Sequence, residues 1–385
     1  MARSIPAFSA LALVLFSASS SSQAPSTDSN NHKTKPQPAD CWEIHSLGTL
    51  GGTFSDATDV NDSGVVVGNS ETEPRILDPA DPPVPLLRAF ISAPNGGAIT
   101  EILTPGFFFG TAVAVNNVGQ VVGSSTIGRS FPISYFTDPG GGNVQTTLAF
   151  ADARDINNVG QTSWDINFPF FRSVIGPNEQ PDFTGTDLID VVVPAVEDPL
   201  NTPFESVALN DAGQVAVNAA GFAYRWSSFE GAIALTPDAQ GSGATGMNEA
   251  GQVVGTLQSD GLTQAFVTKR HNTSLTLLGK PGDGNQPTGI NGLGQIVGTR
   301  PVGSEVHGYV TPPILVQRSI DLDTLNEVTR DGWSKLRPVA INKRGQIAGT
   351  GSIDGHDRAF LLSPRSILAF VPDQNGKHAK CFRLP

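Results

Sequence analysis

Short apolar runs bounded by Gly, Asn, Asp or Pro recur along most of the chain. The clearest set predicts four strands, at residues 245–248, 252–257, 264–268 and 274–278, which are joined by polar turns. Runs this short favour strands, because an amphipathic helix would show its period over a longer stretch. We therefore expect a four-stranded antiparallel unit in this part of the chain.

An Asn-x-x-Gly pattern, usually followed by Gln and two aliphatic residues, recurs in seven such units. The copies are Asn61 to Gly64, Asn116 to Gly119, Asn157 to Gly160, Asn210 to Gly213, Asn248 to Gly251, Asn291 to Gly294 and Asn342 to Gly345. From the first copy to the last, the spacing averages about 47 residues, which lies in the range of propeller blades. Asn can hydrogen-bond its own backbone and Gly supplies a positive φ, so we interpret these residues as structural hairpin turns.

The recurrence predicts an all-β fold, a seven-bladed β-propeller with four strands in each blade. One position before each Asn the residue is aliphatic or Met; two positions before, it is small except at Asp59 and Asp155. Small residues suit strands that crowd around an axis. Close backbone approach is also predicted by a second Gly in five copies: Gly68, Gly123, Gly255, Gly298 and Gly349.

The two ends of the repeat region predict how the ring closes. Residues 42–50 look like the fourth strand of a blade that has no first three strands of its own. We expect them to complete the last blade, with residues 367–371 as the alternative. Cys41 and Cys381 are the only cysteines, and an exported chain meets oxidising conditions, so we expect them to pair. Two free thiols or an intermolecular bridge are the alternatives.

Residues 1–24 have the form of a signal peptide, with Arg3, an apolar stretch at 7–16 and small residues at the expected cleavage position. Residues 25–40 are polar and predict a disordered leader, and residues 41–385 form the repeat domain with a C-terminal tail. The apolar stretch is too short to span a bilayer, so no membrane insertion is expected. The mature chain is expected to be extracellular or periplasmic and monomeric.

Composition supports a turn-rich β protein, because 42 Gly and 29 Pro with only 16% charged residues disfavour helices. The formal net charge is −12, and Lys and Arg are scattered along the chain. Nucleic-acid binding requires clustered basic residues, so nucleic acid is set aside as a partner.

The chain resembles the bacterial extracellular repeats of the HAF family. The resemblance rests on Leu-Gly-Thr-Leu-Gly-Gly at 47–52, on the Asn-x-x-Gly-Gln stretches at 248–255 and 291–298, and on x-Ala-Phe strands at 88–90, 264–266 and 358–360. The His that gives the family its name is replaced in those three strands, and Gly160 is followed by Gln-Thr-Ser instead of aliphatic residues. The resemblance implies a repeat fold and export but brings no established activity.

The sequence contains no common catalytic motif, and no cofactor or metal site is expected. Propellers usually bind ligands with loops at one mouth, and three loops stand out, at 71–87, 107–109 and 326–337. They contain the candidate ligand-binding residues Phe107, Phe108, Phe109, Arg330, Asp331, Trp333 and Lys335. An aromatic side chain beside charged groups suits carbohydrate stacking or a peptide anchor, whereas the Phe residues could instead pack between blades.

Three functions remain open at this stage. The first is a secreted noncatalytic binding module for an extracellular glycan or protein. The second is an enzyme that acts on an extracellular polysaccharide with carboxylates gathered in the mouth. Such a site leaves no linear motif, because its groups come from different blades. The third is a structural protein of the envelope or matrix, and the sequence does not separate it from the first.

Overall fold

The computed structural model describes residues 41–380 except for 77–81, 105–108, 128–130, 150, 167–171, 178–185, 189–203, 271–272, 313–317, 366–370 and 373–378. The signal peptide and leader expected for residues 1–40 therefore lie outside the described residues. Within the described part, seven four-stranded antiparallel sheets and one two-stranded sheet are formed. In six of the four-stranded sheets the strands are hydrogen-bonded in the meander order that consecutive hairpins produce.

Six of these sheets each use four consecutive strands. The first two sheets are β2 (Gly51–Val60), β3 (Val66–Thr72), β4 (Leu87–Ser92), β5 (Ile99–Glu101), and β6 (Gly110–Val115), β7 (Val121–Ile127), β8 (Phe131–Phe136), β9 (Gln145–Ala149). The next two are β10 (Ala151–Ile156), β11 (Gln161–Ile166), β12 (Arg172–Pro177), β13 (Thr186–Asp187), and β14 (Phe204–Leu209), β15 (Val215–Ala219), β16 (Phe222–Ser227), β17 (Gly231–Ala234). The last two are β18 (Gly243–Met247), β19 (Val253–Ser259), β20 (Leu262–Thr268), β21 (Leu275–Leu278), and β22 (Gln286–Ile290), β23 (Ile296–Val302), β24 (Glu305–Val310), β25 (Ile320–Asp321).

The remaining four-stranded sheet joins the two ends of the repeat region. Its order is β1 (Trp42–Ser46), β28 (His356–Pro364), β27 (Ile347–Ile353) and β26 (Ser334–Ile341). Before β26 lie a short 3-10 helix, η1 (Leu322–Thr324), and a single-turn helix, α2 (Asn326–Arg330). The two-stranded sheet pairs β29 (Val371–Pro372) with β30 (Ala379–Lys380).

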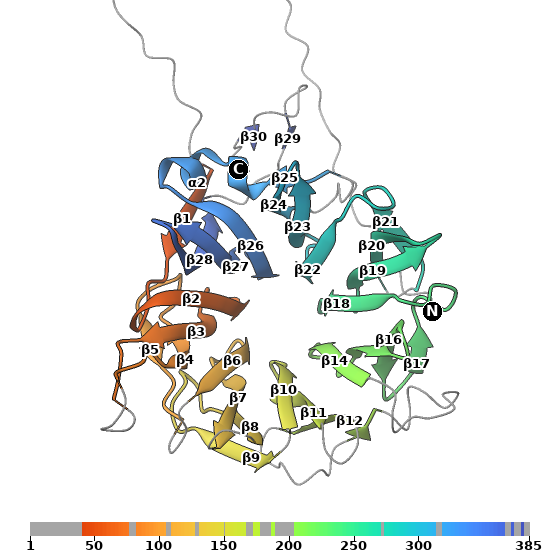
Figure 1. The fold of residues 1–385 in the computed structure, drawn as a ribbon. Helices are drawn as coiled ribbons and strands as arrows, with labels where there is room; N and C mark the ends of the chain where they lie inside the picture. The colour runs from red at the N-terminus through yellow and green to blue at the C-terminus, as the bar shows by residue number, and fades with distance from the viewer. Residues whose placement is uncertain are drawn as a thin grey trace, which may run out of the picture. The chain divides into compact units, whose positions relative to one another are not determined.

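The sheets surround a common axis, with the first strand of each sheet innermost, as Figure 1 shows for β2, β6, β10, β14, β18, β22 and β26. This confirms the predicted all-β propeller. The four strands predicted for residues 245–278 correspond to β18–β21.

Crowding at the axis explains the small residues of the inner strands. A Cβ on Gly289 of β22 would lie 3.1 Å from the carbonyl oxygen of Val339 in β26, the inner strand of the next sheet. Within a sheet, a Cβ on Gly255 would lie only 2.1 Å from the carbonyl oxygen of Gly243. The close approach predicted for the second Gly of the repeat is therefore confirmed, and it has a steric cause.

The N-terminal strand completes the last sheet, as predicted. Strand β1 pairs antiparallel with β28, with Ile44 opposite Leu362. Trp42 is only 1% exposed, and its backbone N–H donates a 2.9 Å hydrogen bond to Oε1 of Glu327 in α2. The alternative strand at 367–371 does not take this place, because its described residue Val371 pairs with β30.

Cys41 lies immediately before β1 and is buried, and no described cysteine is free. Cys381 lies outside the described residues, so the Cys41–Cys381 pairing stays a prediction.

Candidate functional site

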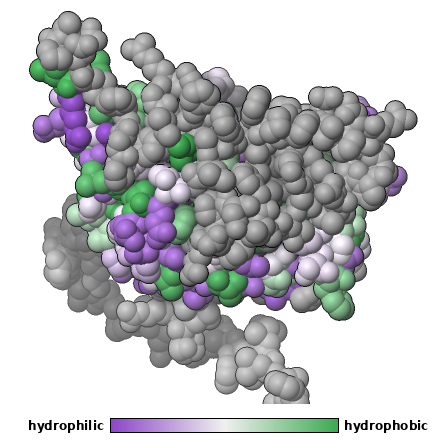
Figure 2. Space-filling view, turned by 90° about the horizontal axis from the view of Figure 1, so that it is seen from below, coloured by the Kyte–Doolittle hydropathy of each residue, from purple (hydrophilic) through white to green (hydrophobic). Residues whose placement is uncertain are grey.

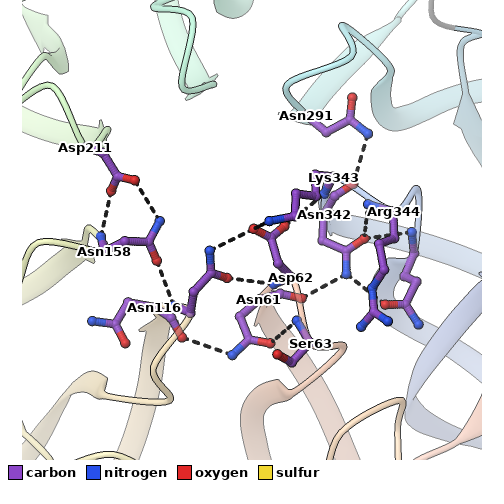
Figure 3. Close-up of polar contacts among 12 residues, drawn as sticks. Asn61, Asp62, Ser63, Asn116, Asn158, Asp211, Asn291, Asn342, Lys343 and Arg344 are labelled. Carbon is purple, nitrogen blue, oxygen red and sulfur yellow. Dashed lines mark hydrogen bonds and ion pairs between the residues drawn. The ribbon is translucent and has the colours of Figure 1, made fainter.

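The seven repeat Asn residues form a closed ring of hydrogen bonds around the axis. Figure 3 shows the part of it that contains Asn61, Asn116, Asn291 and Asn342. Each Asn side chain donates from Nδ2 to the backbone oxygen of the Asn in the next copy, at 2.8 to 3.4 Å. The last step runs from Asn342 to Asn61 and so links the final copy to the first. All seven Asn residues are at most 5% exposed. We call this set the Asn ring.

The same side chains also hold their own turns. In Asn291, for example, Oδ1 accepts hydrogen bonds from the backbone N–H groups of Leu293 and Gln295, and Nδ2 donates to Oε1 of Gln295. The fourth residue of every copy is a Gly with φ between +67° and +83°. The structural role predicted for these turns is therefore confirmed. The hydrogen bonds from each Asn side chain to the next copy were not predicted from the sequence, although the recurring Asn and Gln could have suggested them.

A second set of contacts lies beside the Asn ring, at the first variable position of each turn. The residues are Asp62, Asn117, Asn158, Asp211, Glu249, Gly292 and Lys343, and we call them the rim. Most rim residues donate a backbone N–H to the side chain of the next one, as Asn158 does to Asp211 at 2.7 Å. This series of hydrogen bonds is interrupted at two steps. The N–H of Glu249 finds no acceptor at the next rim position because Gly292 has no side chain, and the N–H of Gly292 finds none because the Lys343 side chain has no acceptor atom.

The rim and all residues of the Asn ring except Asn210 line a cavity of about 450 Å³ at one end of the axis. A Cβ on Gly292 would meet nothing within 4 Å, so the interruption of the rim is open space. Glu249 and Lys343 occupy the rim positions before and after it. Amide, carboxylate and ammonium groups therefore converge on one polar cavity.

The rim carboxylates differ in proton affinity. Partial burial favours protonation of Asp62, but hydrogen bonds from Lys343 and Asn117 outweigh it and hold the pKa of Asp62 below its usual value. Burial, helped by the charges of Asp211 and Asp62, raises the pKa of Glu249 despite a hydrogen bond from the Asp211 backbone. Relative to an ordinary carboxyl group, Asp62 is therefore more readily ionised and Glu249 more readily protonated, and both line the same cavity.

Further along the axis, Asp59 and Asp155 line a cavity of about 350 Å³. Each accepts a hydrogen bond from the next sheet, Asp59 from the N–H of Val115 at 2.9 Å and Asp155 from the N–H of Leu209 at 2.6 Å. Burial raises the pKa of Asp59 to about 6. Burial and the charge of Asp59 raise the pKa of Asp155 to about 8.

These shifts predict that the protein loses stability as the pH rises. A carboxyl group with a raised pKa in the folded state binds its proton more tightly there than in the unfolded chain, so its contribution is present at low pH. For Asp155 this contribution should fall away between about pH 4 and about pH 8. Urea midpoints measured across this range should decline in the wild type and decline less in Asp155→Ala, which carries the residue found at 114, 208 and 340. Equal slopes in both proteins would contradict the assignment.

The loop residues predicted from the sequence, as far as the structure describes them, are not among the residues that line the axial cavity. The described residues of the predicted loops at 71–87, 107–109 and 326–337 lie where second strands end, third strands begin or inner strands are approached, and strand alternation places these positions at the opposite end from the Asn turns. Phe109 is 46% exposed, and Phe107 and Phe108 lie outside the described residues. Arg330, Asp331 and Lys335 are exposed, and Arg330 forms an ion pair with Asp331 at 2.9 Å.

Trp333, a candidate ligand-binding residue in the sequence, does not present its ring to solvent. Trp333 is 5% exposed and packs edge-to-face on Phe360, with ring centroids 5.9 Å apart. Helix α2 and strand β1 complete the core in which the indole is buried. The local sequence could not show this, because Phe360 belongs to the following hairpin and β1 comes from the other end of the chain.

Solved structures support the fold assignment. The β-propeller domain of the trilobed protease from Pyrococcus furiosus is similar with a TM-score of 0.54 at 8% identity, over 80% of this chain and 95% of that one. YCF48 bound to D1 peptide gives 0.52 at 10% identity, over 85% and 98%. An acylaminoacyl peptidase in complex with a chloromethyl ketone gives 0.55 at 8% identity, over 81% and 51%. At these identities the likeness extends to the fold alone.

No protein-family model and no curated protein matches the sequence. Among the described residues, no helix is long and apolar enough to cross a membrane.

Proposed function

We propose that this chain is a secreted, noncatalytic binding module whose ligand enters the axial cavity at the Asn-turn end. The observation that carries the proposal is the polar cavity of about 450 Å³ on which groups from all the repeat turns converge. Since the Asn ring is satisfied by its own hydrogen bonds, it forms a rigid base. The rim side chains also bond to one another, but a carboxylate oxygen has two lone pairs and an ammonium group three donors, so Asp62, Glu249 and Lys343 retain capacity for a ligand. A preformed concave site with a few convergent polar groups is typical of ligand binding.

The chemistry of the rim favours a hydroxylated ligand, such as the terminal sugar of an extracellular glycan. Carboxylates and amide oxygens accept hydrogen bonds from hydroxyl groups, and amide and ammonium groups donate to them. The third residues of several turns, Val118, Val159 and Leu293, are at least half exposed and add apolar area to the same turns. A protein partner that inserts a polar side chain would use the same groups.

The exposed apolar side chains of the described residues do not gather on one face. In Figure 2, hydrophilic and hydrophobic residues are interspersed over the coloured part of the surface. Exposed large apolar side chains are divided between sheets, with Ile76 and Leu103 next to the sheet β2–β5 and Phe229 between β16 and β17. Among the described residues, this scatter gives less support to an apolar docking face than the cavity gives to a polar ligand.

A second candidate function is hydrolysis of an extracellular polysaccharide. It is favoured by the opposite pKa shifts of Asp62 and Glu249 in one cavity, because glycosidases use one protonated and one ionised carboxyl group. If no ligand binds, a structural role in the envelope or matrix is the remaining hypothesis.

We further infer that the seven four-stranded sheets act as seven blades of one closed ring, and that the chain is an exported HAF-type repeat protein. The closed Asn ring and the pairing of β1 with β28 support the first inference. The residues that resemble the family and the signal-like residues 1–24 support the second.

A glycan array with the mature protein, residues 25–385, tests the proposed function, with released products measured in the same wells. We expect binding that weakens at least about tenfold, or about 1.4 kcal/mol, in Gly292→Leu, because the new side chain would project into the open gap of the rim. Gly142→Leu is the matched control. Gly142 lies in the β8–β9 connection and is not among the residues that line the cavity, and a Cβ there also meets nothing within 4 Å.

Product release would favour the hydrolase. If Gly292→Leu bound as tightly as the wild type, the binding site would lie outside the axial cavity. If the wild type bound no glycan on the array, the proposal of a glycan ligand would be wrong.

A further inference from the structure

Apart from the axial cavities, one cluster of potential metal-binding side chains stands out on the sheet β22–β25. His307 comes from β24, Asp321 ends β25, and Asp323 lies in η1. One ligand atom of each residue lies within 4.8 Å of the others. The Nδ1 atom of His307 is 2.9 Å from Oδ2 of Asp321, and both side chains are about 15% exposed.

The surroundings of this cluster leave negative charge in excess. Glu305 brings a third carboxylate, with Oε2 3.5 Å from Nε2 of His307. Arg300 forms an ion pair with Asp321 at 3.9 Å, and its guanidinium also donates a hydrogen bond to the Ser319 hydroxyl. Three carboxylates thus face one imidazole and one guanidinium, an arrangement that a divalent cation would neutralise.

The geometry of Asp323 is held from two sides, so the cluster is preorganised. Its Oδ2 accepts a 3.0 Å hydrogen bond from the N–H of Gly308, and its Oδ1 accepts one of 3.0 Å from the N–H of Leu336 in β26. A carboxylate oxygen has two lone pairs, so each oxygen retains one for a metal ion.

We propose that His307, Asp321 and Asp323 form a binding site for a divalent transition-metal ion, with zinc as the best match to one imidazole and two carboxylates. Zinc accepts this mixed nitrogen and oxygen donor set, whereas calcium and magnesium prefer oxygen donors alone. The ion would replace the proton that His307 shares with Asp321, because only the neutral imidazole can bind a metal.

Metal binding at this site would stabilise the contacts that join the two ends of the repeat region. Asp323 connects η1 to β24 and to β26 of the closing sheet through the two backbone hydrogen bonds described above. The same segment continues into α2, where Glu327 accepts the N–H of Trp42 in β1. A metal ion at the cluster would therefore fix the η1–α2 segment, which contacts the N-terminal strand β1. Metal binding should for this reason raise the thermal stability of the protein.

The test is zinc titration of the chelator-treated full mature chain, followed by calorimetry and by thermal unfolding. We expect a zinc site in the wild type and a rise in Tm of about 3 °C or more at saturation. His307→Gln and, separately, Asp321→Asn should weaken this site at least tenfold and abolish the rise in Tm, while the variants remain folded in the metal-free state. Magnesium should not produce the rise.

His45→Gln is the matched control, since His45 also lies 3.5 Å from a glutamate, Glu43, but without the two aspartates. It should bind zinc as the wild type does. Equal zinc binding and an equal rise in Tm in the wild type and His307→Gln would overturn the proposal, as would the absence of a zinc-dependent rise in the wild type. The result is independent of the glycan test, because the axial cavity contains none of these residues.

Discussion

Replacing Asn291 by alanine should lower the free energy of unfolding by about 3 to 4 kcal/mol. The side chain is 3% exposed and makes four hydrogen bonds: two that its carbonyl oxygen accepts within its own turn, one to Gln295 and one to the backbone of Asn342. Removal of a buried side chain leaves its partners without a replacement, which costs more than the net value of each bond. Urea unfolding monitored by circular dichroism would measure the loss.

The control lies in the same turn. Leu293 is 50% exposed, so Leu293→Ala should change the free energy of unfolding by no more than about 0.5 kcal/mol. Asn291→Asp keeps the shape of the side chain but removes both N–H donors and places a carboxylate oxygen near the carbonyl of Asn342. It should therefore destabilise at least as much as alanine at neutral pH. A loss in Asn291→Ala close to that of Leu293→Ala would show that the Asn ring contributes little to stability.

Trp42→Ala should cost about 3 to 5 kcal/mol, because it leaves a large cavity in the sheet that joins the two ends of the chain. The indole is 1% exposed and belongs to the same core cluster as Phe360, Leu362 and Val328. Loss of this contact weakens the attachment of β1 to β28, so proteolysis near residues 41–50 should become faster than in the wild type.

Glu43→Ala is the control on the same strand, since the Glu43 side chain is about half exposed and its ion pairs with His45 and Arg365 are long. Exposed ion pairs of this kind contribute little, so stability and proteolysis should stay close to the wild type. If Trp42→Ala were as stable as Glu43→Ala, the N-terminal strand would not be a closing element of the ring.

The two functional hypotheses follow from different levels of organisation. The loop hypothesis relied on aromatic and charged residues that are close in sequence, and it failed at Trp333 because the indole packs on Phe360. The axial site gathers single residues from turns that are 38 to 55 positions apart, as in the bonds from Asn210 to Asn248 and from Asn61 to Asn116. No local motif could reveal such a site, although the repetition of Asn identified its members.

The metal cluster illustrates the same limit. His307, Asp321 and Asp323 have no metal-binding spacing in the sequence, and residues 313–317 between them lie outside the described part of the chain. Pairing of β24 with β25 brings His307 near Asp321, and the N–H groups of Gly308 and Leu336 orient Asp323.

By itself, the sequence determined the strand class, the repeat unit and its turns, because these depend on local hydrogen bonding, side-chain alternation and glycine at positive φ. It left two candidates for the strand that closes the last sheet, and the pairing of β1 with β28 decided between them. Tertiary structure alone decided that the seven Asn side chains bond to one another's backbones, that Gly292 opens the rim and that Trp333 is buried. Those features depend on the distances between sheets around the axis and between the two ends of the chain. Such distances are set by packing of small residues such as Gly289 and Ala340 rather than by any neighbouring sequence.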